Sequence, residues 1–566
     1  MNLSKLERTK GYFSFYMICI LFILISFTPF INSIKRKDYY GNYWRSYSYE
    51  ITIKINGTGT QNITSTLYKS CPDYVYYYSY DIKGEDCNRV YIPDYGNQIN
   101  TLTLKWDDPH YFLAHLFENI TNVVEIDLST YDTRGVTDMR QMFWNCESLT
   151  SINLQNIDTS SVTNMRLAFS NCKSLKELDV SHFDTSEVTD MHFMFSYSNL
   201  LTSLDVSRFN TEKVEHFEGM FAAMESLQSI NVKNFDTSKG INMHAMFYNC
   251  RSLTTLDVTN FNTALVTDMS LMFYNVWQIT SLELSNFNTE KVITMRSMFS
   301  SCKNIAKLDL SNWKTPCLRE MEFQFYENNR LTSLDISNFN TTQITSMSNL
   351  FLGCNDIPFL DFSSFDTSNV YTMSHILTNA NNLTSIELSN FRTPSLKDCG
   401  YMFTNCQNLI SLDVNYFDTS KVTNMQAMFA ACNVLKDLKI SNFDTSSVET
   451  MEQMFFACHT LTSLDLSSFV TTKVTNMYSM FIHNYNLKSI SFPNIDTSSL
   501  TDMRGLFCNN PKLEYINIQN YNEESGNDYY LSQSLDLVPE NVVVCLTSNA
   551  ISKFYEVLKT KRCHTI

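Results

Sequence analysis

The feature that most constrains the fold of this chain is an internal repeat of 26 residues. Val162, for example, recurs 26 residues later as Val188, and the residues around it recur with it. The same spacing holds from Val136 to Leu500 without an insertion or a deletion, and a degenerate unit precedes it. A unit of this length is too small to bury its own apolar face, so neighbouring units must stack on one another. The repeat therefore predicts a solenoid.

Each unit divides into two elements. We number positions within a unit from 0 at Val136 and its equivalents. Residues such as Leu201 to Phe209 (positions 13 to 21) alternate apolar and polar side chains, which predicts a short strand. Positions 0, 3, 6, 7 and 10 are apolar, a spacing typical of a helix whose N-cap is Ser or Thr. One strand and one short helix per coil predict an α/β solenoid of about sixteen coils over residues 110–522, with one long parallel sheet.

Several positions keep one residue type through most coils, and we call each such position a column. Thr at position 23 is expected to cap the helix or to bond the backbone of the next coil. The Phe and Met columns are expected to be packing residues and not a metal or redox site. Position 10 is expected to be a small buried side chain, because equivalent sites two coils apart lie about 10 Å apart, beyond the reach of a disulfide. Eight units carry Cys there: Cys146, Cys172, Cys250, Cys302, Cys354, Cys406, Cys432 and Cys458.

The motif Leu-x-x-Leu-Asp-Val-Ser-x-Phe at Leu201–Phe209 is similar to the strand motif of leucine-rich repeats. The longer unit, Phe-Asp/Asn-Thr-x-x-Val-Thr-x-Met-x-x-Met-Phe-x-x-Cys, resembles the repeat of BspA-like leucine-rich-repeat surface proteins, which is also found in mycoplasma lipoproteins and protist surface proteins. The resemblance implies a cell-surface protein, some members being implicated in adhesion to host or matrix. Leucine-rich repeats place Asn or Cys where this chain has Phe209. The backbone at that bend therefore needs another hydrogen-bond partner.

Residues pointing outward from the predicted sheet are the candidates for ligand binding. Position 17 is acidic in most units, and we call this column the acidic strip. Two interpretations stay open. The strip is either a polar sheet face that resists aggregation, or a binding surface for a basic protein segment, a divalent cation or a glycan. Lys439 interrupts the strip, and Asn153, Asn231 and Asn517 remove its charge locally. Its members are Asp127, Asp179, Asp205, Asp257, Asp309, Asp335, Asp361, Asp413 and Asp465, together with Glu283 and Glu387.

The N-terminal segment predicts export. In residues 1–37 a basic start precedes an apolar run of about 20 residues, which is closed by further basic residues. The run is also long enough for one membrane span, so a cleaved signal peptide and an uncleaved signal-anchor through residues 12–34 both stay open. Either one makes the remainder extracellular or cell-surface, secreted or membrane-anchored. Candidate glycosylation sites agree with export: Asn56, Asn62, Asn119, Asn340 and Asn382.

Segments outside the repeat are expected to cap its two ends. Residues 38–109 are rich in Tyr and alternate in places, which predicts a β-rich N-terminal cap. Residues 523–566 predict a C-terminal cap with a strand and a helix. Two cysteine pairs lie in these caps, each flanking a short segment, and are candidate disulfides that would brace the ends of the stack. The pairs are Cys71 with Cys87 and Cys545 with Cys563.

Charge and motifs exclude several functions. A formal net charge of −16 argues against a nucleic-acid partner, which would require a basic face. The sequence has no His pair at metal-ligand spacing, no nucleophile motif and no cofactor motif. The repeated Asp residues occupy equivalent positions, whereas an acid–base pair needs unlike surroundings. We therefore expect neither an enzyme nor a metal or cofactor site.

Two functional hypotheses remain. The first is a surface or secreted module whose extended sheet face binds a protein or glycan ligand through many weak repeated contacts, as in adhesion. The second is a structural coat component that self-associates, or an intracellular repeat scaffold. The sequence leaves the oligomeric state, the ligand and the organism open.

Overall fold

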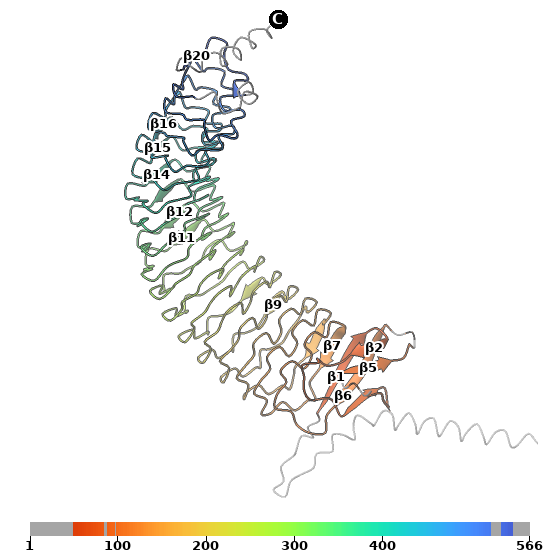
Figure 1. The fold of residues 1–566 in the computed structure, drawn as a ribbon. Coiled ribbons are helices and arrows are strands. Elements are labelled where there is room, and N and C mark those ends of the chain that lie inside the picture. The colour runs from red at the N-terminus through yellow and green to blue at the C-terminus, as the bar shows by residue number, and fades with distance from the viewer. Residues whose placement is uncertain are drawn as a thin grey trace, which may run out of the picture.

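The computed structural model describes residues 49–83, 86, 88–94, 96, 98–521 and 534–546. The chain forms a curved β-solenoid of about sixteen turns, with a small sheet closing its N-terminal end (Figure 1). Successive coils lie side by side along the arc, and each coil of 26 residues contacts its two neighbours. The repeat therefore determines the architecture, as the sequence predicts.

An antiparallel sheet covers the first coil. β1 (Glu50–Asn56) pairs with β6 (Ile99–Lys105) on one side and with β7 (Val123–Asp127), the strand of the first coil, on the other. Alternate residues of β1 are fully buried against the coil. The cap therefore protects an apolar end that a solenoid would otherwise expose. Its other strands are β2 (Gly59–Asn62), β3 (Tyr74–Tyr77), β4 (Tyr80–Asp81) and β5 (Arg89–Ile92).

The strands of the coils are short, parallel and in register. Leu308 lies opposite Leu334, for example, and Asp309 opposite Asp335, a shift of one repeat in each case. Equivalent side chains therefore form straight rows along the sheet. The strands after β7 are β8 (Ser151–Asn153), β9 (Ser203–Leu204), β10 (Ser229–Ile230), β11 (Lys307–Asp309), β12 (Ser333–Asp335), β13 (Phe359–Asp361), β14 (Ser385–Glu387), β15 (Ser411–Asp413), β16 (Asp437–Lys439), β17 (Ser463–Asp465), β18 (Ser489–Ser491), β19 (Tyr515–Asn517) and β20 (Val543–Cys545).

The short helix expected in each coil is absent, because the described residues between 49 and 521 form no helix. Positions 0 to 10 instead form turns whose N–H groups donate to the next coil. The N–H of Met139 donates to the carbonyl of Asn164 at 3.0 Å, and that of Phe143 to the carbonyl of Ala168 at 2.9 Å. The same bonds recur in later coils. Backbone hydrogen bonds thus run between coils and not along a helix, so the chain is a β-solenoid and not an α/β solenoid.

Backbone conformation at positions 5 and 9 explains the missing helix. Both positions have positive φ, as at Gln141 (54°) and Asn145 (63°) and at their equivalents in later coils. A left-handed residue interrupts a right-handed helix and costs about 1–2 kcal/mol for most residues, but less for Asn, which recurs at position 9. The apolar spacing nevertheless identified the buried side chains correctly. Turns such as the one closed by Met142 N–H and Met139 C=O follow one another through this segment and keep positions 3, 6, 7 and 10 inside, the positions that an apolar helix stripe would also bury.

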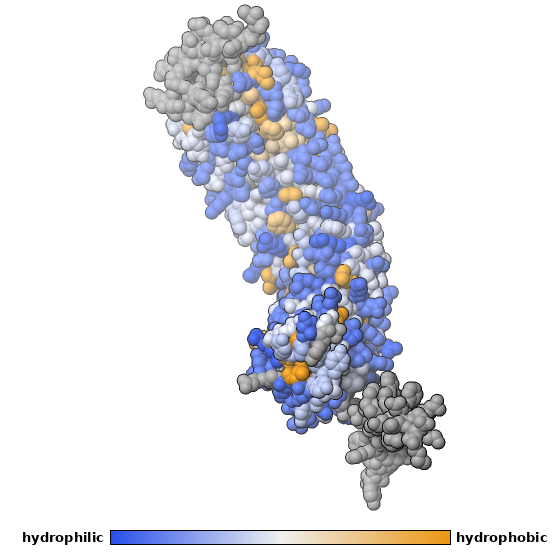
Figure 2. Space-filling model, turned by 90° about the vertical axis from the view of Figure 1, so that its right-hand side faces the viewer, coloured by the Kyte–Doolittle hydropathy of each residue, from blue (hydrophilic) through white to orange (hydrophobic). Residues whose placement is uncertain are grey.

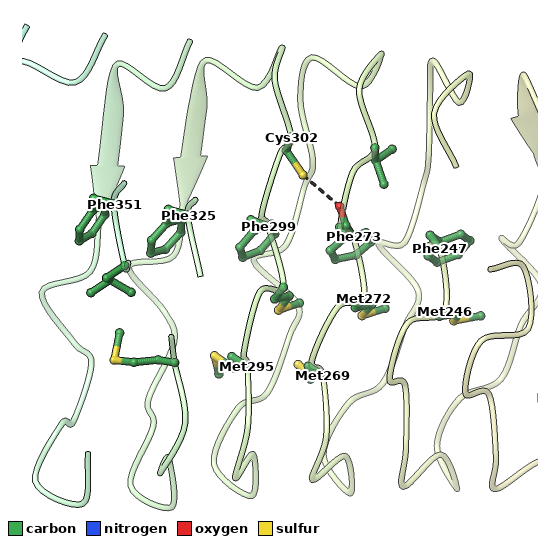
Figure 3. Close-up of a cluster of buried hydrophobic side chains, with 14 of the residues drawn as sticks. Met246, Phe247, Met269, Met272, Phe273, Met295, Phe299, Cys302, Phe325 and Phe351 are labelled. Atoms are coloured by element: carbon green, nitrogen blue, oxygen red, sulfur yellow. Dashed lines mark hydrogen bonds between the residues drawn. The ribbon is translucent and has the colours of Figure 1, made fainter. Parts of the chain in front are cut away.

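Aromatic side chains at position 7 form a column through the interior, which is interrupted once, at Leu377. Phe273 lies between Phe247 and Phe299, with ring centroids 6.0 and 5.8 Å away and nearly parallel planes (Figure 3). Met272 and its equivalents pack beside this column and are also fully buried. These residues are buried packing residues, as predicted.

The Thr column at position 23 holds adjacent coils together. The hydroxyl of Thr341 donates to the carbonyl of Asp366 at 2.9 Å and accepts the N–H of the same residue at 2.8 Å. Thr341 is 1% exposed. Equivalent pairs recur through the stack, for example from Thr185 to Asn210. The column therefore bonds the backbone of the next coil and supplies the partner that the bend lacks where leucine-rich repeats have Asn.

The Cys column is a row of buried free thiols, as predicted. All eight of its cysteines are buried and unpaired. Each donates a hydrogen bond from Sγ to a backbone carbonyl of the preceding coil, as Cys302 does to Phe273 at 3.0 Å (Figure 3). Burial raises the pKa of Cys302 to about 12, so the thiol stays protonated. Asn484 makes the equivalent bond, from Nδ2 to the Phe455 carbonyl at 3.0 Å.

One coil departs from this core, and the departure predicts a stabilising substitution. Gln324 occupies the apolar column at position 6, is 0% exposed, and neither of its amide atoms has a hydrogen-bond partner. We expect Gln324→Met, the residue most coils carry there, to raise the free energy of unfolding by about 1–3 kcal/mol, because a buried unpartnered amide is costly. Urea unfolding measures the change. Gln228→Met, at an exposed site, is the control, and a Gln324→Met variant no more stable than that control would contradict the expectation.

Candidate ligand-binding surfaces

The acidic strip lies on the outward face of the parallel sheet. None of its members is buried, and the in-register pairing aligns them in one row, as with Asp361 opposite Glu387. Lys439 interrupts the row and forms an ion pair with Asp413 at 3.1 Å. Figure 2 shows one side of the stack, which is largely hydrophilic with scattered hydrophobic residues and a cluster of them toward the C-terminal end.

Each strip carboxylate also closes the turn that follows its strand. One oxygen of Asp205 accepts both the hydroxyl of Ser207 at 2.6 Å and its backbone N–H at 3.0 Å. These two bonds hold the pKa of the Asp205 carboxyl below its usual value, so it is charged at neutral pH. Asp309 is bonded in the same way by Ser311. Within the described chain, the second oxygen of both residues accepts no protein hydrogen bond and faces solvent.

The same turn forms without a negative charge. Asn231 accepts the N–H of Lys233 at 3.2 Å, and Asn153 accepts that of Gln155 at the same distance. An amide oxygen therefore closes the turn as a carboxylate oxygen does. The charge of the strip is an additional property, which the turn does not require.

The coils also place two residue sets together that the sequence did not single out. We call positions 8 to 12, which follow the Phe column, the rim. Trp277 on the rim lies between Arg251 of the preceding coil and Lys303 of the following one, whose charged groups are each 4.8 Å from the indole centroid. Tyr248 and Tyr274 stack beside them at 5.0 Å, with ring planes 15° apart. The sequence did contain a signal for this set. Positions 8 and 11 carry bulky aromatic residues here, whereas several other coils have Ser, Thr or Asn there.

A second set surrounds Glu218. His192 lies 3.1 Å from its carboxylate, and Asn242 donates to the same oxygen at 3.1 Å. Burial raises the pKa of Glu218, but the His192 hydrogen bond and the nearby His244 and His216 outweigh it, so the pKa is lowered. In the sequence these histidines form no pair at metal-ligand spacing, so they did not indicate this set. Within the described residues, no group of three or more His, Cys, Asp or Glu side chains is arranged to hold a metal ion.

A cleft of about 440 Å³ lies where the N-terminal cap meets the first coil. Tyr68, His110, Tyr111, Phe112 and Arg140 contribute to its walls. Tyr111 and Phe112 are exposed, whereas burial lowers the pKa of His110. The cleft could accept a small group with both apolar and polar parts. It forms between two segments of different character, so no single sequence motif marks it.

Comparison with protein families decides the class of the chain. The family described as "Mycoplasma protein of unknown function, DUF285" matches residues 112–229, 168–282, 198–313, 253–355, 319–411 and 397–521. The chain belongs to this family. Its matches overlap and extend through the whole stack of coils, and its description assigns no catalytic activity. No curated protein matches the chain.

Several solved structures of leucine-rich-repeat proteins are similar to the chain. One from Bacteroides ovatus is 16% identical, with 85% of this chain and 100% of that chain covered and a TM-score of 0.30. A leucine-rich cell-surface protein from Faecalibacterium prausnitzii is 14% identical, with 80% and 91% covered and a TM-score of 0.20. A protein from Leptospira interrogans is 11% identical, with 75% and 90% covered and a TM-score of 0.19.

The structure gives different results for the two predicted disulfides. Cys71 is a disulfide cysteine, but Cys87 lies outside the described residues, so their pairing stays a prediction. Cys545 is a free thiol, and the structure does not contain its predicted bond to Cys563, which also lies outside the described residues. Cys545 instead continues the parallel sheet on β20, where its thiol interacts with Tyr515 and raises the pKa of that phenol.

All five predicted glycosylation sites are exposed: Asn56, Asn62, Asn119, Asn340 and Asn382. Two of them also bond neighbouring coils. The Oδ1 atom of Asn119 accepts from Asn145 at 2.7 Å, and that of Asn382 accepts from Asn408 at 3.3 Å. Their modification stays a prediction.

The predicted signal peptide or signal-anchor, residues 1–37, lies outside the described residues, and so do residues 38–48 of the expected N-terminal cap. Of the expected C-terminal cap, residues 534–546 are described, and they add β20 to the end of the sheet. In the described part of the chain, no helix is long and apolar enough to cross a bilayer.

Proposed function

We propose that this chain is a non-catalytic repeat protein, secreted or held at the cell surface, whose acidic strip binds a basic segment of a protein ligand. One observation carries the proposal. The strip keeps a negative charge in seven successive coils although an uncharged Asn closes the same turn elsewhere in the stack. The seven residues are Asp257, Glu283, Asp309, Asp335, Asp361, Glu387 and Asp413.

Electrostatics supports a use for this charge. Carboxylates in adjacent coils lie about 5 Å apart and repel one another by roughly 1 kcal/mol in water. A row that served the turns alone would not need a carboxylate in every coil, because Asn153 and Asn231 close the same turn. A cationic ligand would turn the repulsion into attraction, and a rigid row with constant spacing offers it several contacts at once.

The surface location rests on the sequence. The basic and apolar segment in residues 1–37 is typical of a secretory signal, and the repeat resembles that of BspA-like surface proteins, some of which are implicated in adhesion. The exposed sites Asn340 and Asn382 agree with export. A chain built from repeated columns, without a set of unlike acid and base groups, suits binding better than catalysis.

A triple substitution tests the strip. Asp309, Asp335 and Asp361 changed together to Asn remove three charges and keep the turn acceptors. We expect the affinity for a lysine-rich peptide, measured by calorimetry at low salt, to fall by at least about tenfold, with no change in thermal unfolding. Glycan binding through the same strip would instead survive the loss of charge.

The matched control removes the same charge from another corner of the coil. Asp366, Asp418 and Asp444 at position 22 also close turns, by accepting the N–H groups of Ser368, Ser420 and Ser446. Changing these three to Asn should alter the affinity by less than about twofold if binding is local. Equal losses in both triple variants would mean that only net charge matters, and the strip proposal would then fail.

A further inference from the structure

The rim around Trp277 differs from the rest of position 11. The column reads Glu225, Arg251, Trp277, Lys303 and Asn329 over five successive coils. Arg251 is also near Glu225, at 3.8 Å. In the following coils the column continues as an amide ladder, in which Asn355 donates to Asn329 at 3.3 Å. Two cations flanking an indole therefore precede a ladder of hydrogen-bonded amides in the next coils.

Polar atoms at this place lack partners. The indole N–H of Trp277, the Nε–H of Arg251 and the hydroxyl of Ser300 are buried, and none of the three has a hydrogen-bond partner. Ser300 is 1% exposed. Buried donors without acceptors cost about 1–3 kcal/mol each, so the arrangement is unfavourable unless something else accepts from them. The first two atoms can only donate. The missing group is therefore rich in acceptors.

Aromatic rings border the same place. Tyr248 and Tyr274 stack on neighbouring coils, and Tyr326 occupies the same column two coils beyond Tyr274, with Ser300 between them. Ser300 fills the interval between Tyr274 and Tyr326, because it is only 1% exposed. The three tyrosine rings are half-buried, so a ligand would meet their exposed edges and would not enter between them.

The local charge is positive. Arg251, Lys303 and Arg330 lie on the rim over four successive coils, in a chain whose net charge is −16. The acidic residues beside them are Glu225, 3.8 Å from Arg251, and Glu327, which accepts the hydroxyl of Tyr326 at 3.0 Å. A guanidinium and an ammonium beside aromatic rings suit a ligand that carries both flat apolar ring faces and anionic groups.

We propose that the rim between Tyr248 and Arg330 is a binding site for an acidic glycan, a sugar chain that carries carboxylate or sulfate groups. Arg251 and Lys303 already cover the two faces of the indole, so sugar rings would lie across the exposed edges of Trp277 and the tyrosines. The same two cations would meet the anionic groups. The site goes beyond the acidic strip, because it lies on another part of the coil and selects a ligand of opposite charge. One protein could then bind a basic protein segment and an acidic glycan at separate surfaces.

The test uses the full chain with a sulfated hexasaccharide and its desulfated counterpart. We expect calorimetry to show binding of the sulfated probe that weakens with added salt. Trp277→Ala should weaken it by at least about tenfold, and so should the double change Arg251→Asn with Lys303→Asn. Asn is the residue that this column itself carries at Asn329, so the double variant should fold normally, as thermal unfolding would check.

Two controls separate this site from the rest of the molecule. Lys173→Asn, in the same column but paired with Glu147 at 2.6 Å, should leave the affinity within about twofold. The triple Asn variant of the acidic strip should also bind the sulfated probe normally, so failure of one proposal is distinguishable from failure of the other. Three results would overturn the rim proposal: no binding of the sulfated probe, equal losses in Trp277→Ala and Lys173→Asn, or equally tight binding of a polyglutamate peptide.

Discussion

Replacing Phe273 with Ala should lower the free energy of unfolding by about 3–5 kcal/mol. The ring is 0% exposed and stacks between Phe247 and Phe299, so its removal opens a cavity in the middle of the aromatic column. The cavity cannot close easily. Hydrogen bonds on both sides of the ring, including that from Phe273 N–H to the Met298 carbonyl at 3.0 Å, hold the coils at a constant spacing.

Urea unfolding, followed by circular dichroism, measures this loss, and Phe359→Ala is its control. Phe359 lies on β13 and is 51% exposed, so the same substitution there should change stability by less than about 0.5 kcal/mol. In a repeat protein the damage spreads to neighbouring coils, and a broader transition is expected as well. Similar effects of the two substitutions would mean that the aromatic column does not hold the stack together.

Replacing Thr341 with Val should cost about 2–4 kcal/mol, because two buried backbone groups lose their partner at once. The hydroxyl both donates to the Asp366 carbonyl and accepts the Asp366 N–H, and Val fills the same space without either bond. Thr341→Ser keeps the hydroxyl and should recover most of the loss. The same unfolding measurement applies.

Thr332→Val is the matched control for this prediction. Its hydroxyl also donates to the neighbouring coil, to the Ala306 carbonyl at 3.0 Å, but the residue is exposed and water can replace the bond. We expect a change of less than about 1 kcal/mol there. If Thr341→Ser were as unstable as Thr341→Val, the hydroxyl would not be the source of the stability.

Sequence periodicity predicted the stack and the buried columns, because both follow from side-chain chemistry repeated at a fixed spacing. For the Thr column it left two roles open, and the structure shows the second, bonding the backbone of the next coil. Periodicity misjudged the backbone at positions 0 to 10. An apolar residue every third or fourth position is equally consistent with a helix and with successive turns that contain left-handed residues such as Asn145. Asn at position 9 indicated the second possibility, together with Gly219, Gly353 and Gly505 at position 5 or 9. Such single-residue preferences are weak beside an apolar stripe.

The candidate sites likewise include some that the sequence predicted and some that it did not. The acidic strip was predictable because its residues recur in phase, and the structure adds that Ser207 and its equivalents bond it. The rim at Trp277 and the cleft at His110 depend on residues that occur once, brought together by coils or by the cap. A search for repeated positions does not detect residues that occur only once. They become visible only when neighbours in adjacent coils are known.

The central claim is that the chain is exported and is secreted or held at the cell surface. The most direct test is surface labelling of intact cells that produce the chain, paired with N-terminal sequencing of the mature protein. We expect a membrane-impermeant reagent to label the protein. A mature chain that keeps residues 12–34 would identify a signal-anchored surface protein, and one that begins near residue 34 would identify a secreted protein retained by a partner. A protein that stays unlabelled until the cells are lysed, with residues 1–37 intact, would contradict the claim and make the solenoid an intracellular scaffold.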